Sequence, residues 1–150
     1  MNHAAIPARE GIERLLFAYS DTIDRGDFES TAALFGADGL YGLVGSRAAK
    51  GSQQVLATFH SNVQLYDGVP RTRHVVTNVV IDVDEVGTTG TARSYVQVLH
   101  QAPGRALAPV AAGTYHDRVH LADGEWRFAE RRMIIELVGD MSTHLKQNPF

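Results

Sequence analysis

The sequence predicts one α+β domain in which helices come first and an antiparallel sheet follows. The first half of the chain carries apolar residues at helical spacing, whereas the second half is rich in β-branched residues. Short stretches with turn chemistry join the β-rich runs, which favours a meander of neighbouring strands. Helices that are segregated from such a sheet define the α+β class. The 150 residues contain no repeat or linker and have the size of one domain.

Three helices are expected in the first half. The second, from Phe28 to Phe35, is capped by Asp27, and the third begins at a cap on Ser52 and ends before Pro70. The first runs from about Ala8 to Arg25, and its apolar stripe consists of Ile12, Leu15, Leu16, Tyr19 and Ile23. Such a stripe faces the core of a folded domain.

Five strands are expected. A short one, Leu40 to Val44, lies between the second and third helices. The four long strands of the meander span Thr72–Asp84, Ala92–Leu99, Val110–Leu121 and Trp126–Val138. If this sheet curls around the first helix, a cavity remains between the two.

The composition excludes several classes of function. A net charge of −3 gives no basic surface for nucleic acid or an anionic membrane. The chain has no cysteine and shows no nucleotide-binding, serine acyl-transfer or metal motif. His116 and His120 share one strand face, but they stand roughly 13 Å apart and are too distant to share a metal ion. We therefore expect no metal or cofactor. We also expect a cytoplasmic protein, since no signal peptide or membrane-spanning run is evident.

His74 is the first candidate for chemistry. In an alternating strand it shares a mixed face with Val76, Asn78, Val80 and Asp82. Such a face suits either the lining of a ligand pocket or contact with solvent. The opposite face, which looks like the core side, is formed by Val75, Thr77, Val79, Ile81 and Val83.

Asp24 is unusual because it lies in the last turn of the first helix, where a carboxylate opposes the helix dipole. It sits on the shoulder of the apolar stripe, and periodicity slightly favours a surface pair with Arg25 or another surface cation. Tyr19 lies within the stripe, so its buried hydroxyl needs a partner. Both positions remain open between a structural and a catalytic role.

Arg131 lies in the last strand, on a face that it shares with Ala129, Met133, Ile135 and Leu137. An arginine on such an apolar face is buried and needs an anion. A structural salt bridge and a catalytic role are about equally plausible for it.

Several segments together resemble one known family. They are IERLLFAYSDTIDRGDFESTAALFGADG, RTRHVVTN and GTYHDRVHLADGEWRFAERR, with the third helix between the first two. In order and spacing they are similar to the SnoaL-like branch of the nuclear transport factor two-like superfamily, in particular to the group of scytalone dehydratase and hexachlorocyclohexane dehydrochlorinase. The resemblance implies a cone-shaped, curved antiparallel sheet wrapped around the N-terminal helices, with an internal pocket.

The resemblance also implies a set of site residues. Asp24 and His74 match the catalytic pair of the group, and Arg131 matches an arginine that keeps the aspartate ionised. Tyr19 occupies the place of a polar residue five positions before the aspartate, and it is expected to donate to a developing oxyanion or a departing hydroxide, with Tyr41 as the second candidate for that role. The remaining residues expected to bind substrate are Tyr41, Phe59, Val76, Asn78, Tyr115 and Ile135. A second histidine found in scytalone dehydratase has no clear counterpart, because neither His100 nor His116 fits.

The function that follows is a cofactor-independent lyase or isomerase that uses His–Asp general base catalysis. Its substrate is expected to be a small apolar molecule that is cyclic, aromatic, polyketide-like or steroid-like. The alternative is a non-catalytic ligand-binding or assembly module, such as the small subunit of a ring-hydroxylating oxygenase. Relatives suggest a homotrimer, or else a dimer, and the apolar face with Val75, Val79 and Ile81 would suit that interface. The tail from Gly139 to Phe150 either folds over the pocket mouth or is disordered.

Overall fold

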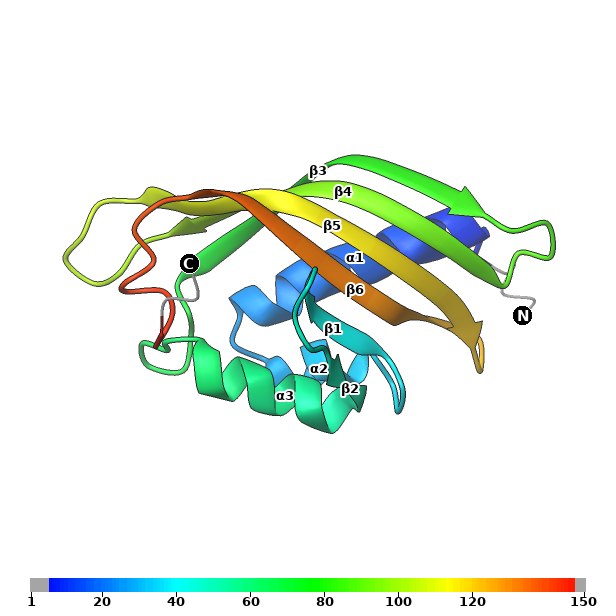
Figure 1. The fold of residues 1–150 in the computed structure, drawn as a ribbon, viewed down its shortest axis with the longest axis horizontal. Helices are drawn as coiled ribbons and strands as arrows, with labels where there is room; N and C mark the ends of the chain where they lie inside the picture. The colour runs from blue at the N-terminus through cyan, green and yellow to red at the C-terminus, as the bar shows by residue number, and fades with distance from the viewer. Residues whose placement is uncertain (1–5, 148–150) are drawn as a thin grey trace.

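A computed structural model describes residues 6–147 and has the predicted α+β architecture. Figure 1 shows the four long strands curving over the first helix, with the other helices and the short strands gathered on the opposite side of that helix. None of the helices within residues 6–147 is long and apolar enough to cross a membrane. In chain order the elements are α1 (Ala8–Asp24), α2 (Phe28–Ala33), β1 (Leu40–Leu43), β2 (Ala49–Lys50), α3 (Gly51–Asn62), β3 (Thr72–Val83), β4 (Thr89–His100), β5 (Ala108–Ala122) and β6 (Glu125–Val138).

The sheet has six strands in the order β2-β1-β6-β5-β4-β3. The four long strands form the predicted antiparallel meander. The sheet as a whole is mixed, because β1 pairs with β6 in the parallel direction, with Leu40 opposite Glu130. Strand β2 was not predicted from the sequence, because it comprises only two residues.

The core lies between the inner face of the sheet and the apolar stripe of α1. The whole predicted stripe is at most 5% exposed, and residues from the other elements pack against it. The ring of Tyr19 is surrounded by other aromatic rings at centroid distances of 6.0–6.4 Å, namely those of Phe35, Tyr41, Phe59, Tyr115 and Phe128. This packing fixes α1 against the sheet and so positions the end of the helix, where Asp24 lies.

The helix boundaries agree with the prediction for α1 and α2 but not for α3. The carboxylate of Asp27 accepts a hydrogen bond from the Ser30 amide at 3.1 Å, as expected of a cap. Ser52 is not a cap, since α3 begins one residue earlier and the Ser52 amide donates to the Gly36 carbonyl at 2.8 Å. The helix also ends sooner than predicted, because Val63 is already extended and pairs with Leu145.

A β-bulge in β3 overturns the predicted alternation of this strand. Thr77 lies opposite Tyr95 and Val80 lies opposite Arg93, so one extra residue is inserted between the two pairs. Asn78, within the bulge, has a φ of +52°, a conformation that asparagine tolerates better than most residues. The bulge exchanges the two faces: Ile81 is 2% exposed, whereas Val80 is 55% exposed.

Two expectations about β3 are therefore wrong. Asn78 is exposed at the bulge and does not line the cavity described below. Val79 and Ile81 pack against the core, so they are unavailable for the predicted interface between subunits.

The C-terminal segment, defined here as residues 139–147, runs back along the end of α3. The Gln64 amide donates to the His144 carbonyl at 2.9 Å, and the Lys146 amide donates to the Asn62 carbonyl at 2.8 Å. The Tyr66 hydroxyl donates to the Thr143 carbonyl at 2.6 Å. Of the two alternatives for the tail, residues 139–147 follow the first and close one side of the cavity; residues 148–150 lie outside the described part.

Candidate active site

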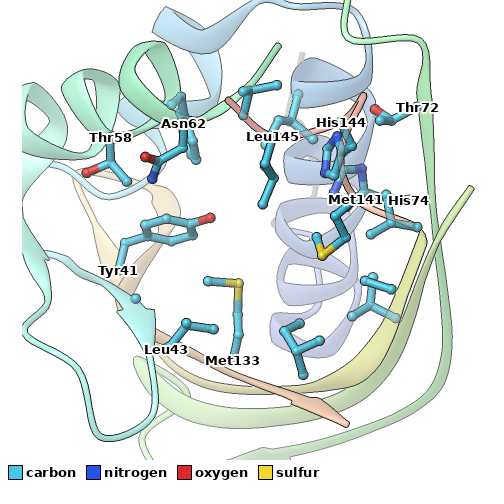
Figure 2. A pocket seen from close by; sticks show the side chains of 18 of the residues that line it. Tyr41, Leu43, Thr58, Asn62, Thr72, His74, Met133, Met141, His144 and Leu145 are labelled. Carbon is cyan, nitrogen blue, oxygen red and sulfur yellow. The ribbon is translucent and has the colours of Figure 1, made fainter. Parts of the chain in front are cut away.

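A mostly apolar cavity of about 400 Å³ lies between the sheet, α1, α3 and the C-terminal segment. Figure 2 shows the ring of Tyr41 on one side of this cavity and the rings of His74 and His144 on the other. The volume is within the range of roughly 300–1,000 Å³ that is usual for small-molecule sites. Apolar side chains from six parts of the fold form its walls, among them Ile23, Leu43, Phe59, Val96, Val98, Met133, Ile135, Met141 and Leu145.

Asp24 and His74 form a hydrogen-bonded pair at the edge of this cavity. The Nδ1 atom of His74 lies 2.6 Å from Oδ1 of Asp24. The Asp24 carboxylate also accepts bonds from the His74 amide and the Thr72 hydroxyl, both at 2.8 Å. The His74 and Asp24 side chains are only 9% and 11% exposed. The predicted surface pair of Asp24 with Arg25 is absent among the residues that the structure describes, because Arg25 pairs with Asp21 instead.

The surroundings of Asp24 keep its carboxyl group ionised. Burial alone would raise the pKa of Asp24, but the hydrogen bonds from His74 and Thr72 and the positive charge of a protonated His74 outweigh burial and hold the pKa below its ordinary value. An ionised carboxylate only accepts hydrogen bonds, so it selects the His74 tautomer with hydrogen on Nδ1. Within residues 6–147, Nε2 of His74 has no hydrogen-bond partner and is left to meet a ligand.

Two tyrosines supply hydroxyl groups near the same cavity. The Tyr19 hydroxyl donates to the Tyr41 hydroxyl at 3.2 Å, and both residues line the cavity. Burial raises the pKa of both tyrosines, so both hydroxyls remain protonated at neutral pH. Because Tyr19 uses its hydrogen on Tyr41, Tyr41 is the residue whose own hydroxyl hydrogen is available to a ligand.

Arg131 is fully buried, as its apolar strand face predicts, and it has found an anion. Its Nε and Nη2 atoms donate to the two carboxylate oxygens of Asp117, each at 2.8 Å. Its guanidinium carbon lies 3.8 Å from the ring centroid of Tyr115 and 4.4 Å from that of Tyr19. The ion partner differs from the one implied by the resemblance, because Arg131 pairs with Asp117 and not with Asp24. Arg131 lies behind the aromatic wall and does not line the cavity.

Only some of the other predicted site residues line the cavity. Phe59, Tyr115 and Ile135 line the cavity together with Tyr19, Tyr41 and His74. Val76 instead borders an outer cleft between α1 and β3, which is also lined by Asp24 and His74. Asn78 borders neither, because of the bulge.

Sequence reasoning missed the residues that the C-terminal segment brings to the cavity. Met141, His144 and Leu145 line it, and Asn62 and Thr58 of α3 add polar groups (Figure 2). The segment has no periodic pattern, so no local signal identified them. Residues 6–147 contain no cluster of three or more His, Cys, Asp or Glu side chains that could hold a metal ion.

Several solved structures share this fold. A protein from Novosphingobium aromaticivorans, provisionally assigned as a scytalone dehydratase, is 27% identical with a TM-score of 0.72, over 88% of this chain and 86% of that one. A variant of Rv3472, a protein of unknown function from Mycobacterium tuberculosis, is 26% identical with a TM-score of 0.71, over 87% of this chain and 77% of that one. A provisionally assigned aromatic ring hydroxylase from N. aromaticivorans has a TM-score of 0.73 at 21% identity, over 94% of this chain and 99% of that one, and shows the fold alone.

No curated protein matches the chain in sequence. A family model does, and it agrees with the fold and with the segments that first suggested the resemblance. The model of the SnoaL-like domain matches residues 4–132, which include α1, the pair of Asp24 and His74, and Arg131. This chain belongs to the SnoaL-like domain family, and its fold is nuclear transport factor two-like.

Proposed function

We propose that this protein is a cofactor-independent lyase or isomerase in which His74 removes a proton from a carbon next to an electron-withdrawing group. One observation carries the proposal: His74 is hydrogen-bonded to a buried carboxylate through Nδ1, while Nε2 is left free beside an apolar cavity. This arrangement suits a general base.

Asp24 supports each stage of the proton transfer. It accepts the Nδ1 hydrogen of neutral His74, which leaves the Nε2 lone pair to take the proton of the substrate. When His74 becomes an imidazolium, the carboxylate stabilises the new positive charge. The proton then returns to the substrate at another carbon in an isomerisation, or leaves with the departing group in an elimination.

Tyr41 is placed to stabilise the negative charge that develops on the substrate. Its hydroxyl points into the cavity from the side opposite His74 (Figure 2). Since Tyr41 accepts a hydrogen bond from Tyr19, its own hydrogen becomes a stronger donor to an oxyanion. Apolar walls around this hydrogen bond exclude water and strengthen it.

The substrate is proposed to be a small cyclic or aromatic molecule of polyketide-like or steroid-like character. The apolar lining and the volume of the cavity support this class. The scytalone dehydratase assignment of one similar structure points to the same kind of chemistry.

The experiment is deuterium exchange into ketones with acidic α-protons, namely 2-tetralone, 1-indanone and a 5-ene-3-ketosteroid. In D₂O, the protein is expected to exchange the α-protons of at least one of these ketones, and His74→Gln is expected to lower the rate by about 10²–10⁴. Mass spectrometry follows the exchange, and His116→Gln, on the exposed outer face, is the matched control. Wild-type exchange no faster than that of His74→Gln for all three ketones would contradict the proposal. Tight binding of such ligands without any exchange would instead support a non-catalytic binding module.

We also propose a homo-oligomer, with an interface that differs from the predicted one. The outer face of the sheet exposes Tyr95, Ile134 and Leu137, which lie on β4 and β6. Exposed apolar side chains of this size favour contact between subunits. Size-exclusion chromatography with light scattering is expected to report a trimer or dimer, and a clean monomer would remove this proposal.

A further inference from the structure

We propose that His144 is a second ligand-contacting histidine, which hydrogen-bonds a neutral oxygen substituent on the molecule held in the cavity. This inference rests on the proposed function and deepens it, because it defines the ligand as an apolar cyclic skeleton that carries a ketone or hydroxyl group.

The position of His144 is the first support. It belongs to the C-terminal segment, yet its side chain lines the same cavity as His74 and lies on the same side of it (Figure 2). The residue is only 7% exposed. Two histidines from distant parts of the chain therefore line the same cavity.

The second support is a buried ring nitrogen without a partner. Among residues 6–147, Nδ1 of His144 has no hydrogen-bond partner, although it is inaccessible to solvent. Such atoms are rare and costly in folded proteins. An apolar side chain would fill this place without that cost. The presence of an imidazole therefore suggests that the hydrogen-bond partner is a group of the ligand, which the ring meets by reorienting when the ligand binds.

The backbone on both sides of His144 is held in place, so the ring is presented to the cavity at a fixed point. The His144 carbonyl accepts from the Gln64 amide at 2.9 Å, and the His144 amide donates to the Met141 carbonyl at 3.0 Å. The neighbouring Thr143 hydroxyl lies 3.1 Å from Nε2 of the buried His100. Because the backbone is fixed in advance, only the imidazole ring has to reorganise when a ligand binds.

The charge state of His144 selects the kind of oxygen that it would bind. Burial, together with positive charge on His74 and His100, lowers the pKa of His144 to about 4. At neutral pH the ring is uncharged, with one N–H donor and one lone pair. It therefore suits a ketone, which accepts, or a hydroxyl, which does both; a carboxylate would find no counterion in it.

Binding of a matched pair of probes tests this inference without requiring turnover. 2-Tetralone and tetralin have nearly the same shape and differ by one carbonyl oxygen. His144→Phe is expected to lower the preference for 2-tetralone over tetralin by about tenfold, the value of one hydrogen bond. Calorimetric titration measures both dissociation constants, and the affinity for tetralin is expected to be unchanged or higher.

Two further variants complete the experiment. His144→Asn keeps a donor and an acceptor and is expected to restore part of the preference, whereas His116→Phe, on the exposed face of β5, is expected to leave it at the wild-type value. An unchanged preference in His144→Phe, or failure of the wild-type protein to bind either probe, would overturn the inference. Failure of the His74 proposal would appear in the deuterium exchange instead, since the binding preference does not depend on proton removal.

Discussion

At the scale of single residues, Asp24 acts through the tautomer that it imposes on His74. Asp24→Asn is expected to lower the exchange rate of a reactive ketone by at least about 10², because the amide can donate to Nδ1 and so place the His74 hydrogen on Nε2. The control is Asp21→Asn, an exposed carboxylate one turn earlier in α1, which is expected to retain the wild-type rate. A fully active Asp24→Asn protein that still binds the ketone would show that the tautomer is irrelevant.

The buried pair of Arg131 and Asp117 is expected to be structural. Arg131→Met leaves the Asp117 carboxylate buried without its partner, and should reduce the free energy of unfolding by about 3–5 kcal/mol. The double variant Arg131→Met/Asp117→Leu removes both charges and should lose clearly less than the sum of the single variants. Urea denaturation measures all four proteins, and strictly additive losses would mean that the two residues do not depend on each other.

These residues also show how far sequence reasoning reaches at this scale. The alternation of the last strand predicted that Arg131 is buried and needs an anion. It could not identify Asp117, because that depends on the register that places Asp117 opposite Arg131. For Asp24 the periodicity slightly favoured the surface, and only the resemblance to a family suggested the pair with His74.

At the scale of elements, local patterns predicted the helices and strands that carry a regular apolar or β-branched pattern of their own. The stripe of α1 and the β-branched runs of the four long strands were sufficient to place them within a few residues. The end of α3 was misplaced because residues after Asn62 pair with the C-terminal segment, a contact that no local pattern encodes. The parallel pairing of β1 with β6 was missed for the same reason.

The bulge in β3 gives a prediction at this scale. Asn78 is exposed and has a φ of +52°, so its conformation and not its contacts should decide the effect of a substitution. Asn78→Val is expected to destabilise the protein by about 1–2 kcal/mol, because a β-branched residue resists positive φ, whereas Asn78→Gly should be neutral or stabilising. Thermal or urea denaturation measures the change, with Thr77→Val in the regular part of the strand as control. Equal stability of the Val and Gly variants would argue against the bulge.

At the scale of the whole molecule, the curved sheet and α1 leave a space that the C-terminal segment closes with a buried histidine. This closure should make stability depend on pH. His144 has a pKa of about 4 in the folded protein and 6.5 when unfolded, so between these values the unfolded chain binds a proton that the folded chain excludes. The free energy of unfolding therefore has its full value above pH 6.5, where His144 is neutral in both states, and it decreases as the pH falls from 6.5 towards 4.

The expected size of this effect is about 2 kcal/mol between pH 7 and pH 5. Urea denaturation at the two pH values measures it, and His144→Phe should lose about that much less stability on acidification than the wild-type protein does. The comparison cancels the contributions of Asp24 and other groups that both proteins share. Equal losses in the two proteins would show that His144 is not kept neutral by the fold.

At this scale the whole fold holds His74 with Nδ1 bonded to Asp24 and leaves Nε2, among residues 6–147, without a partner beside the cavity. The most direct measurement is nitrogen-15 NMR of the His74 ring at neutral to mildly alkaline pH, assigned by the signals that disappear in His74→Gln. We expect Nδ1 to carry the hydrogen, shared with Asp24, and Nε2 to carry none. A ring with its hydrogen on Nε2 and a bare Nδ1 would overturn the proposed role of His74, because its lone pair would then face Asp24 and not a substrate.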